Sequence, residues 1–135
     1  MSKLPMIARY LLGAALVLFG ANGFFEFIPP FEQDPDSIAA RFLAILPETG
    51  YLWYLVKGTE VLVGILLVTG RYVPIALILL GPISVNIVAY HAFLDPANIV
   101  PALVVFSLNL YLLLTHRKTA YAALFNSPAD AVSGE

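Results

Sequence analysis

Residues 73–94 read VPIALILLGPISVNIVAYHAFL, a stretch without aspartate, glutamate, lysine or arginine. A helix needs about 20 mainly apolar residues to cross the hydrocarbon core of a bilayer. The whole chain of 135 residues is 60% hydrophobic and 12% charged, with a mean hydropathy of +0.86. An ordinary soluble domain carries about a quarter charged residues. The sequence therefore predicts an integral membrane protein.

Three further apolar runs accompany this stretch, at about residues 7–28, 51–69 and 99–115. The first run could be read as a cleaved signal peptide, but its apolar core exceeds the roughly 7–15 residues typical of one, which favours an uncleaved span. We expect an all-α membrane protein, a four-transmembrane-helix bundle, with a single domain over residues 1–125. A flexible C-terminal tail is expected over 126–135.

The charged residues outside the apolar runs are distributed unevenly between the two sets of helix ends. Cytoplasmic ends of membrane helices carry an excess of lysine and arginine. One set of ends has only Arg41 among several acidic residues, and the other set carries Lys3, Arg9, Arg71, Arg117 and Lys118. We therefore expect cytoplasmic N and C termini and a multi-pass topology.

A helical pattern also lies in the long outer connection between the first two runs. Ile38, Phe42 and Ile45 recur on one helix face, and Ser37 precedes them as a candidate N-cap. This pattern predicts a short amphipathic helix in the first outer loop, lying on the membrane surface or across the mouth of the bundle. A plain connector is the alternative.

Motifs for soluble-enzyme chemistry are absent from the sequence. There is no cysteine, which excludes disulfides, thiolate nucleophiles and thiolate metal ligands. No phosphate-binding glycine loop, nucleophile elbow or metal-ligand spacing occurs. The net charge of −2 gives no basis for nucleic-acid binding. We therefore predict no catalytic residue, no metal site, no intrinsic cofactor and no autonomous enzyme activity.

Polar residues inside the apolar runs are the candidates for function, because a charge at a helix centre costs about 2.5–3.5 kcal/mol on insertion. Lys57 and Glu60 lie within the second run, and Glu26 lies near the outer end of the first. At a rise of about 1.5 Å per residue, Asn22 and Asn86 come to about the depth of Lys57. We predict a polar cluster in the outer half of the membrane, made of Asn22, Glu26, Lys57, Glu60, Asn86 and Tyr90.

Helix geometry separates His91 from this cluster. At about 100° per residue, His91 is about 140° around the helix from Asn86 and nearer the side of Ser84. Pro82 could kink this helix and alter the angle. We therefore treat His91 as a peripheral candidate.

Two interpretations of the polar cluster remain open at this point. Lys57 and Glu60 could form a buried ion pair that fixes helix register and binds nothing. Alternatively, the cluster could line a pocket, open to the outer side, that holds a lipid head group, a quinone ring or an ion.

Three segments of the sequence resemble a known family. They are FGANGFFEFIPP at 19–30, YLVKGTEVLVGILLVTGRYVP at 54–74 and GPISVNIVAYHAFLDP at 81–96. In these segments the chain is similar to the DoxX-like group of small four-helix membrane proteins, and the similarity extends over about residues 8–125. Its most specific part is Glu60 followed by Gly64 and Gly70.

The resemblance implies a four-helix bundle in a bacterial inner membrane. Some DoxX-like proteins are associated with quinone-linked oxidation of thiosulfate, and others with membrane complexes that handle oxidative or thiol stress. The resemblance therefore implies an accessory subunit of a membrane redox or respiratory-type complex, such as a quinone-linked oxidoreductase, that binds a quinone or similar amphiphile. Its partners would be the lipid bilayer, subunits of that complex and a second copy of the chain. The alternative is a non-catalytic scaffold or assembly factor, and a weaker one is a small-solute or proton transporter acting as a dimer.

Overall fold

The computed structural model describes residues 2–122, and the regular elements in this range are all helices. Four stretches, Leu4–Phe25, Leu52–Thr69, Val73–Leu94 and Pro96–His116, are long and apolar enough to cross a membrane. This result confirms the expected all-α fold with four membrane-spanning helices. The elements in order are α1 (Leu4–Phe25), α2 (Ile38–Glu48), α3 (Leu52–Thr69), α4 (Val73–Leu94), the 3₁₀ helix η1 (Pro96–Asn98) and α5 (Ile99–His116).

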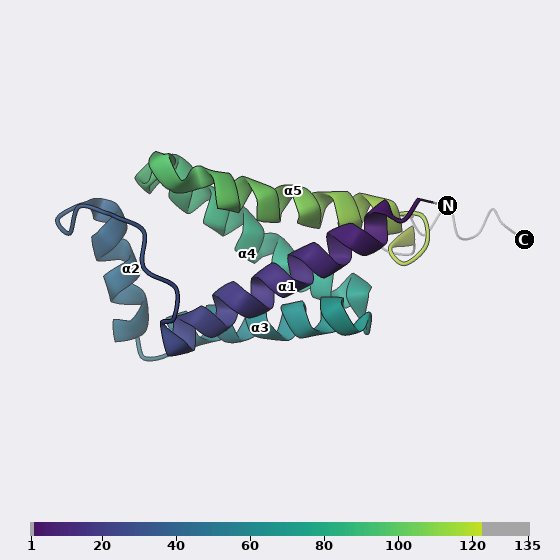
Figure 1. Cartoon of the computed structure of the whole chain (residues 1–135), viewed down its shortest axis with the longest axis horizontal. Helices are drawn as coiled ribbons and strands as arrows, with labels where there is room; N and C mark the ends of the chain where they lie inside the picture. The colour runs from purple at the N-terminus through teal and green to yellow at the C-terminus, as the bar shows by residue number, and fades with distance from the viewer. Residues whose placement is uncertain (1, 123–135) are drawn as a thin grey trace, which may run out of the picture.

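The four long helices pack as two neighbouring pairs (Figure 1). Helix α1 lies along α3, and α4 lies along α5. The short helix α2 runs across one end of the bundle, which we call the α2 end. The first turn of α1 and the last turn of α5 both lie at the opposite end. This arrangement agrees with four consecutive crossings of a membrane.

Glycines bring the backbones of α1 and α3 into direct contact. A Cβ atom added to Gly64 of α3 would lie 2.8 Å from the carbonyl oxygen of Gly13 and 2.8 Å from the backbone nitrogen of Val17. Gly20 of α1 similarly faces the backbone of Val61. Small residues allow this close approach between membrane helices, where lipid supplies no hydrophobic driving force.

The interior of the bundle is made of aliphatic side chains from all four long helices. The opposite faces of the same helices remain exposed in the isolated chain and carry large apolar residues such as Leu11, Leu62 and Leu79. A bilayer would cover these faces. The buried leucine and valine residues with at most 3% exposure are Leu12, Leu16, Val63, Leu67, Leu77, Leu80 and Leu112.

Helix α1 begins and ends three residues earlier than the expected span of 7–28. Its end is set by Asn22, whose side-chain Oδ1 accepts a hydrogen bond from the backbone nitrogen of Ile28 at 2.6 Å. Glu26 follows the helix in a left-handed conformation with φ of 49°. The chain therefore leaves the helix three residues before residue 28, where the expected span ends.

The other long helices lie close to their expected positions. Helix α3 starts one residue later than expected, α5 ends one residue later, and α4 covers 73–94 as expected. Helix α4 continues through Pro82 without interruption. The tail expected at 126–135 lies outside the described residues.

Helix α2 forms where the amphipathic pattern predicted a short helix. Ser37 is its N-cap, and the Ser37 hydroxyl accepts a hydrogen bond from the backbone nitrogen of Ala40 at 3.1 Å. Phe42 packs against Tyr90 of α4, with 5.6 Å between the ring centroids. Ile38 and Ile45 remain more than half exposed. The apolar face of α2 is thus free to contact a membrane surface.

Two side chains bind helix termini at the end opposite α2. Arg9 of α1 donates a hydrogen bond from Nη1 to the carbonyl oxygen of Leu67 at 3.0 Å, near the C-terminus of α3. Tyr121 donates to the carbonyl oxygen of Pro74 at 2.7 Å. Burial raises the pKa of Tyr121, so its hydroxyl keeps the proton that it donates.

Candidate functional site

Lys57 and Glu60 form an ion pair on α3, as charged residues inside a membrane helix require. Lys57 Nζ lies 3.1 Å from Glu60 Oε2, and the two residues are one helical turn apart. Glu60 is only 4% exposed, and the Lys57 side chain is 18% exposed. Position i+3 on a helix places both side chains on one face. That face of α3 points into the bundle.

A partly open cavity of about 160 Å³ lies against this ion pair. The walls of the cavity come from all four long helices and from the connection between α1 and α2. An engineered cavity of about 150 Å³ in another protein binds benzene, so this volume suits one six-membered ring. The residues that line the cavity are Leu16, Phe19, Phe31, Lys57, Glu60, Ile87, His91, Pro101, Ala102 and Val105.

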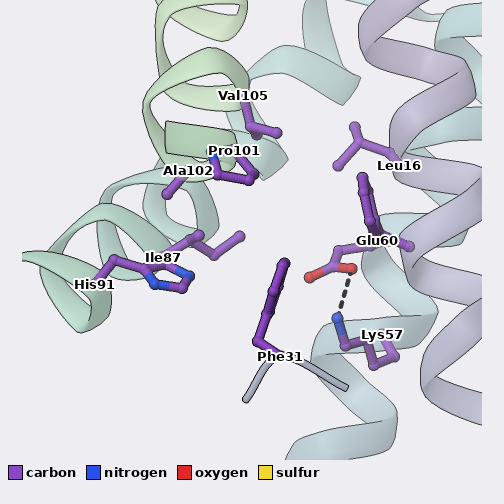
Figure 2. Close-up of a pocket in the computed structure, with 10 residues that line it drawn as sticks. Leu16, Phe31, Lys57, Glu60, Ile87, His91, Pro101, Ala102 and Val105 are labelled. Carbon is purple, nitrogen blue, oxygen red and sulfur yellow. Dashed lines mark hydrogen bonds and ion pairs between the residues drawn. The ribbon is translucent and has the colours of Figure 1, made fainter. Parts of the chain in front are cut away.

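The Glu60 carboxylate presents one free oxygen to the cavity. Oε2 bonds to Lys57, whereas Oε1 points toward Phe31 (Figure 2). Among the described residues, no donor forms a hydrogen bond with Oε1. A carboxylate oxygen is a strong acceptor. The cavity therefore contains an acceptor that a ligand can use.

Lys57 is fixed on its other side by Trp53. The ammonium group lies 5.1 Å from the centre of the Trp53 ring, within the range of a cation–π contact. Trp53 Nε1 in turn donates a hydrogen bond to the carbonyl oxygen of Gly23 at 2.9 Å. These contacts hold Lys57 beside Glu60 and leave ammonium protons available as donors.

Phe31 and His91 lie across the cavity from the ion pair. Phe31 comes from the connection between α1 and α2, and its ring lies between His91 on one side and Glu60 on the other (Figure 2). No sequence pattern singles out Phe31, because no periodicity predicts which side chain of an irregular connection turns inward. Its position next to Pro29 and Pro30 was the only available signal.

Asn22 and Glu26 do not line this cavity. They border a separate hollow on the far side of Lys57, together with Trp53 and Pro30. Glu26 is exposed, and Asn22 uses its side-chain oxygen to bind the backbone beyond α1. Of the predicted cluster, only Lys57 borders both hollows.

Asn86 and His91 lie on the opposite sides of α4 from those expected from the sequence. Asn86 is exposed on the outer face of α4, whereas Ser84 is fully buried and His91 lines the cavity. The exposed position of Asn86 differs from the inward-facing one expected from the sequence. His91 is therefore part of the candidate site, and Asn86 is not.

Tyr90 connects α4 to the segments at the α2 end. Its hydroxyl accepts a hydrogen bond from Gln33 Nε2 at 3.1 Å and lies 3.4 Å from the carbonyl oxygen of Ala39. Its ring contacts Phe42 of α2 and the ring of His91. Tyr90 therefore positions the wall of the cavity and is not among the residues that line it.

Comparison with known proteins identifies the family. A family model described as DoxX matches residues 4–92. The chain belongs to the DoxX family. No curated protein and no solved structure matched it. Lys57, Glu60 and His91 all lie in the DoxX region, whereas the wall that α5 contributes lies beyond it.

The three most specific residues of the resemblance have different roles in this DoxX protein. Gly64 lets the backbones of α1 and α3 touch, and Gly70 ends α3 in a left-handed conformation with φ of 71°. Neither glycine lines the cavity. Of these three residues, only Glu60 lines the cavity, and its carboxylate is a hydrogen-bond acceptor there.

A second buried polar pair in the DoxX protein joins α4 to α5. Asn109 Nδ2 donates a hydrogen bond to the Ser84 hydroxyl at 3.1 Å, and that hydroxyl donates to the carbonyl oxygen of Gly81 at 2.9 Å. Ile87 and Val105 line the cavity. About one helical turn closer to the end opposite α2 lie Ser84 and Asn109. This pair links α4 to α5 on the side of the cavity that faces away from the α2 end.

Proposed function

We propose that this DoxX protein is an accessory membrane subunit that binds the head group of a quinone or similar amphiphile in the cavity beside Lys57 and Glu60. The observation that carries the proposal is the free Oε1 atom of Glu60, a residue that is 4% exposed and faces a cavity of ring size. The cavity beside the ion pair favours a ligand site over a pair that only fixes helix register.

The composition of the cavity supports a ring with polar substituents. Ligand pockets are usually lined by apolar side chains, with a few polar groups that fix orientation. Here the aromatic ring of Phe31 and the aliphatic walls would contact the ring of the ligand. Lys57 would donate a hydrogen bond to a carbonyl oxygen of the quinone, and Glu60 would hold Lys57 in place. In the reduced form of the ligand, Glu60 Oε1 would accept a hydrogen bond from a hydroxyl.

The chain would supply binding and orientation, and a partner subunit would supply the redox centre. The quinone contributes the electron-transfer chemistry when it is bound. We place the protein in a bacterial inner membrane with the α2 end outside and both termini in the cytoplasm. The positively charged residues at the end opposite α2, such as Arg9 and Arg71, support this orientation.

Replacing Glu60 by glutamine is expected to weaken quinone binding by about tenfold or more. The substitution keeps the size of the side chain but removes the charge that holds Lys57, the donor to the quinone carbonyl, in place. A hydrogen bond to a charged group contributes about 1.5–3 kcal/mol. Binding of a short-chain quinone to purified protein in lipid nanodiscs, measured by equilibrium dialysis, tests this expectation. Asn86→Ala is the matched control, because Asn86 is exposed and lies outside the cavity.

Two outcomes would contradict the proposal. The wild-type protein would show no saturable quinone binding, or Glu60→Gln would bind as tightly as Asn86→Ala. Mass spectrometry of lipids that co-purify with the wild-type protein gives an independent measurement. A quinone retained by the wild type and lost in Glu60→Gln is the expected result.

Labelling of single cysteines tests the proposed orientation. The chain has no cysteine of its own, so each introduced residue gives a unique signal. Asp36→Cys, at the α2 end, is expected to react with a membrane-impermeant maleimide in intact spheroplasts. Lys118→Cys, beyond α5, is expected to react only after permeabilisation. The reverse pattern would place the cavity toward the cytoplasm.

A further inference from the structure

Asn86 presents an amide without a hydrogen-bond partner to the hydrocarbon of the membrane. It lies on an exposed face of α4, eight positions before the end of that helix at Leu94, which places it about 12 Å inside the span. Among residues 2–122, the side-chain hydrogen bonds of α4 come from Ser84, Tyr90 and His91, and none comes from Asn86. A polar group without a partner is costly in hydrocarbon, because no water is available to bind it.

The helix that carries Asn86 cannot satisfy this amide by itself. The side chain has donor hydrogens on Nδ2 and an acceptor oxygen, Oδ1. A backbone carbonyl of the preceding turn can accept from Nδ2. The backbone N–H groups within a helix, however, already donate to carbonyl oxygens four residues earlier, and lipid tails offer no donor. Oδ1 of Asn86 therefore requires a donor from another polypeptide segment within the membrane.

Asn86 also lies near the middle of a regular stripe of residues along α4. Its members follow one another at alternating intervals of four and three residues, the spacing at which two helices pack along a left-handed seam. All are exposed except one alanine, which is partly buried, and the two ends of the stripe are 57% and 85% exposed. We call this stripe the α4 seam, and its residues are Ile75, Leu79, Pro82, Asn86, Ala89 and Phe93.

Symmetry makes a second copy of the chain the partner that fits this seam. Two copies that cross the membrane in the same direction are related by a twofold axis along the membrane normal, so each residue near the axis meets its own counterpart at the same depth. An asparagine amide is complementary to itself, because Nδ2 of each copy can donate to Oδ1 of the other. A single asparagine in a seam of this spacing also favours two helices in one register.

We propose that the chain forms a homodimer in the membrane through the α4 seam, with the two Asn86 side chains hydrogen-bonded to each other. The apolar members of the seam supply van der Waals contacts, and the small side chain of Ala89 lets the two helices approach closely. The walls of the cavity beside Lys57 and Glu60 belong to one chain. The dimer therefore leaves that cavity intact in each copy, and this inference does not rest on the proposed quinone site.

Association in lipid vesicles measures the strength of this contact. Asp36→Cys, at the α2 end, is labelled with a donor or an acceptor fluorophore, and energy transfer between copies is followed as the protein-to-lipid ratio changes. Adding Asn86→Leu is expected to raise the dissociation constant by about tenfold or more, because leucine gains little from leaving lipid. Asn86→Gln keeps an amide and is expected to retain part of the association. Ser107→Ala is the control, since Ser107 is exposed on α5 and its hydroxyl can bond to its own helix.

Disulfide cross-linking of single cysteines tests the symmetry of the contact. Cysteines at identical positions can join only where their Cβ atoms come within about 4.5 Å of each other, which a twofold axis along the seam allows. Leu79→Cys and Ala89→Cys are each expected to give covalent dimers when membranes are oxidised. Val85→Cys is the matched control. Val85 is 56% exposed but lies about 100° around the helix from Asn86, so this variant is expected to stay monomeric.

Three results would each overturn the inference. The protein would stay monomeric at the highest protein-to-lipid ratio, the dissociation constant would be unchanged by Asn86→Leu, or Val85→Cys would cross-link as strongly as Leu79→Cys. Cross-linking of Leu79→Cys to a different protein would assign the seam to another partner and would also overturn it. Circular dichroism checks the fold of Asn86→Leu, and the cross-linking series keeps Asn86 and does not depend on that variant. Dimers that bind no quinone would overturn the proposed function alone.

Discussion

Lys57→Met is expected to destabilise the protein by about 3–5 kcal/mol, since it leaves the carboxylate of Glu60 buried without its partner. Glu60 is 4% exposed, and its only hydrogen bond among the described residues comes from Lys57. Unfolding by increasing fractions of a denaturing detergent, followed by circular dichroism, measures the change. Lys3→Met, which removes an exposed lysine, is the control and is expected to have little effect.

The double variant Lys57→Met/Glu60→Met separates the two interpretations of the pair. Replacing a whole buried ion pair by apolar groups is often neutral or stabilising, so we expect stability within about 1 kcal/mol of the wild type. The folded double variant is also expected to lose quinone binding. Retained binding would contradict the proposed site. A double variant as unstable as Lys57→Met would show that the unpaired carboxylate of Glu60 is not what destabilises Lys57→Met.

Gly64→Leu is expected to cost at least about 3 kcal/mol by forcing α1 and α3 apart. A Cβ at this position already meets backbone atoms of α1 at 2.8 Å, and backbone cannot move aside as a flexible side chain can. Overpacking of a well-packed interior costs about 1–3 kcal/mol and occasionally more. Leucine is intrinsically better than glycine in a helix by about 1 kcal/mol, so the measured loss understates the steric cost.

Gly58→Leu and Gly81→Leu are the matched controls for this prediction. Both glycines lie inside long helices, but a Cβ at either position meets no atom within 4 Å. These substitutions are expected to be neutral or stabilising by up to about 1 kcal/mol. Equal losses at Gly58 and Gly64 would show that helix contact is not the cause. The same unfolding measurement serves all three variants.

Hydropathy was sufficient to predict the four spans, because a bilayer requires a long apolar run for each crossing. The bounds of α4 agree with the prediction, since Arg71 and Asp95 mark the polar boundaries on each side. The end of α1 was less predictable. It depends on the hydrogen bond from the Ile28 backbone to the Asn22 side chain, and the apolar pattern continues past it.

The composition of the cavity was only partly predictable. Lys57 and Glu60 stood out because charges within a span must pair or face water. The sequence did not determine which face of α4 points into the bundle, because large apolar residues occur all around this helix and lipid covers the faces that the bundle does not. Asn86 and His91 were therefore assigned to the opposite faces from those they occupy. Phe31 and Gln33 belong to an irregular connection, for which no sequence periodicity exists.

The pairing of α1 with α3 imposes an order on the biogenesis of the protein. Synthesis proceeds from the N-terminus, so α1 is made before its principal partner. During that interval the glycine face of α1, including Gly13 and Gly20, contacts only lipid or the insertion machinery. Only when α3 has emerged can the two backbones close against each other. The connection through residues 26–51 is the tether that keeps α1 near the membrane site where α3 arrives.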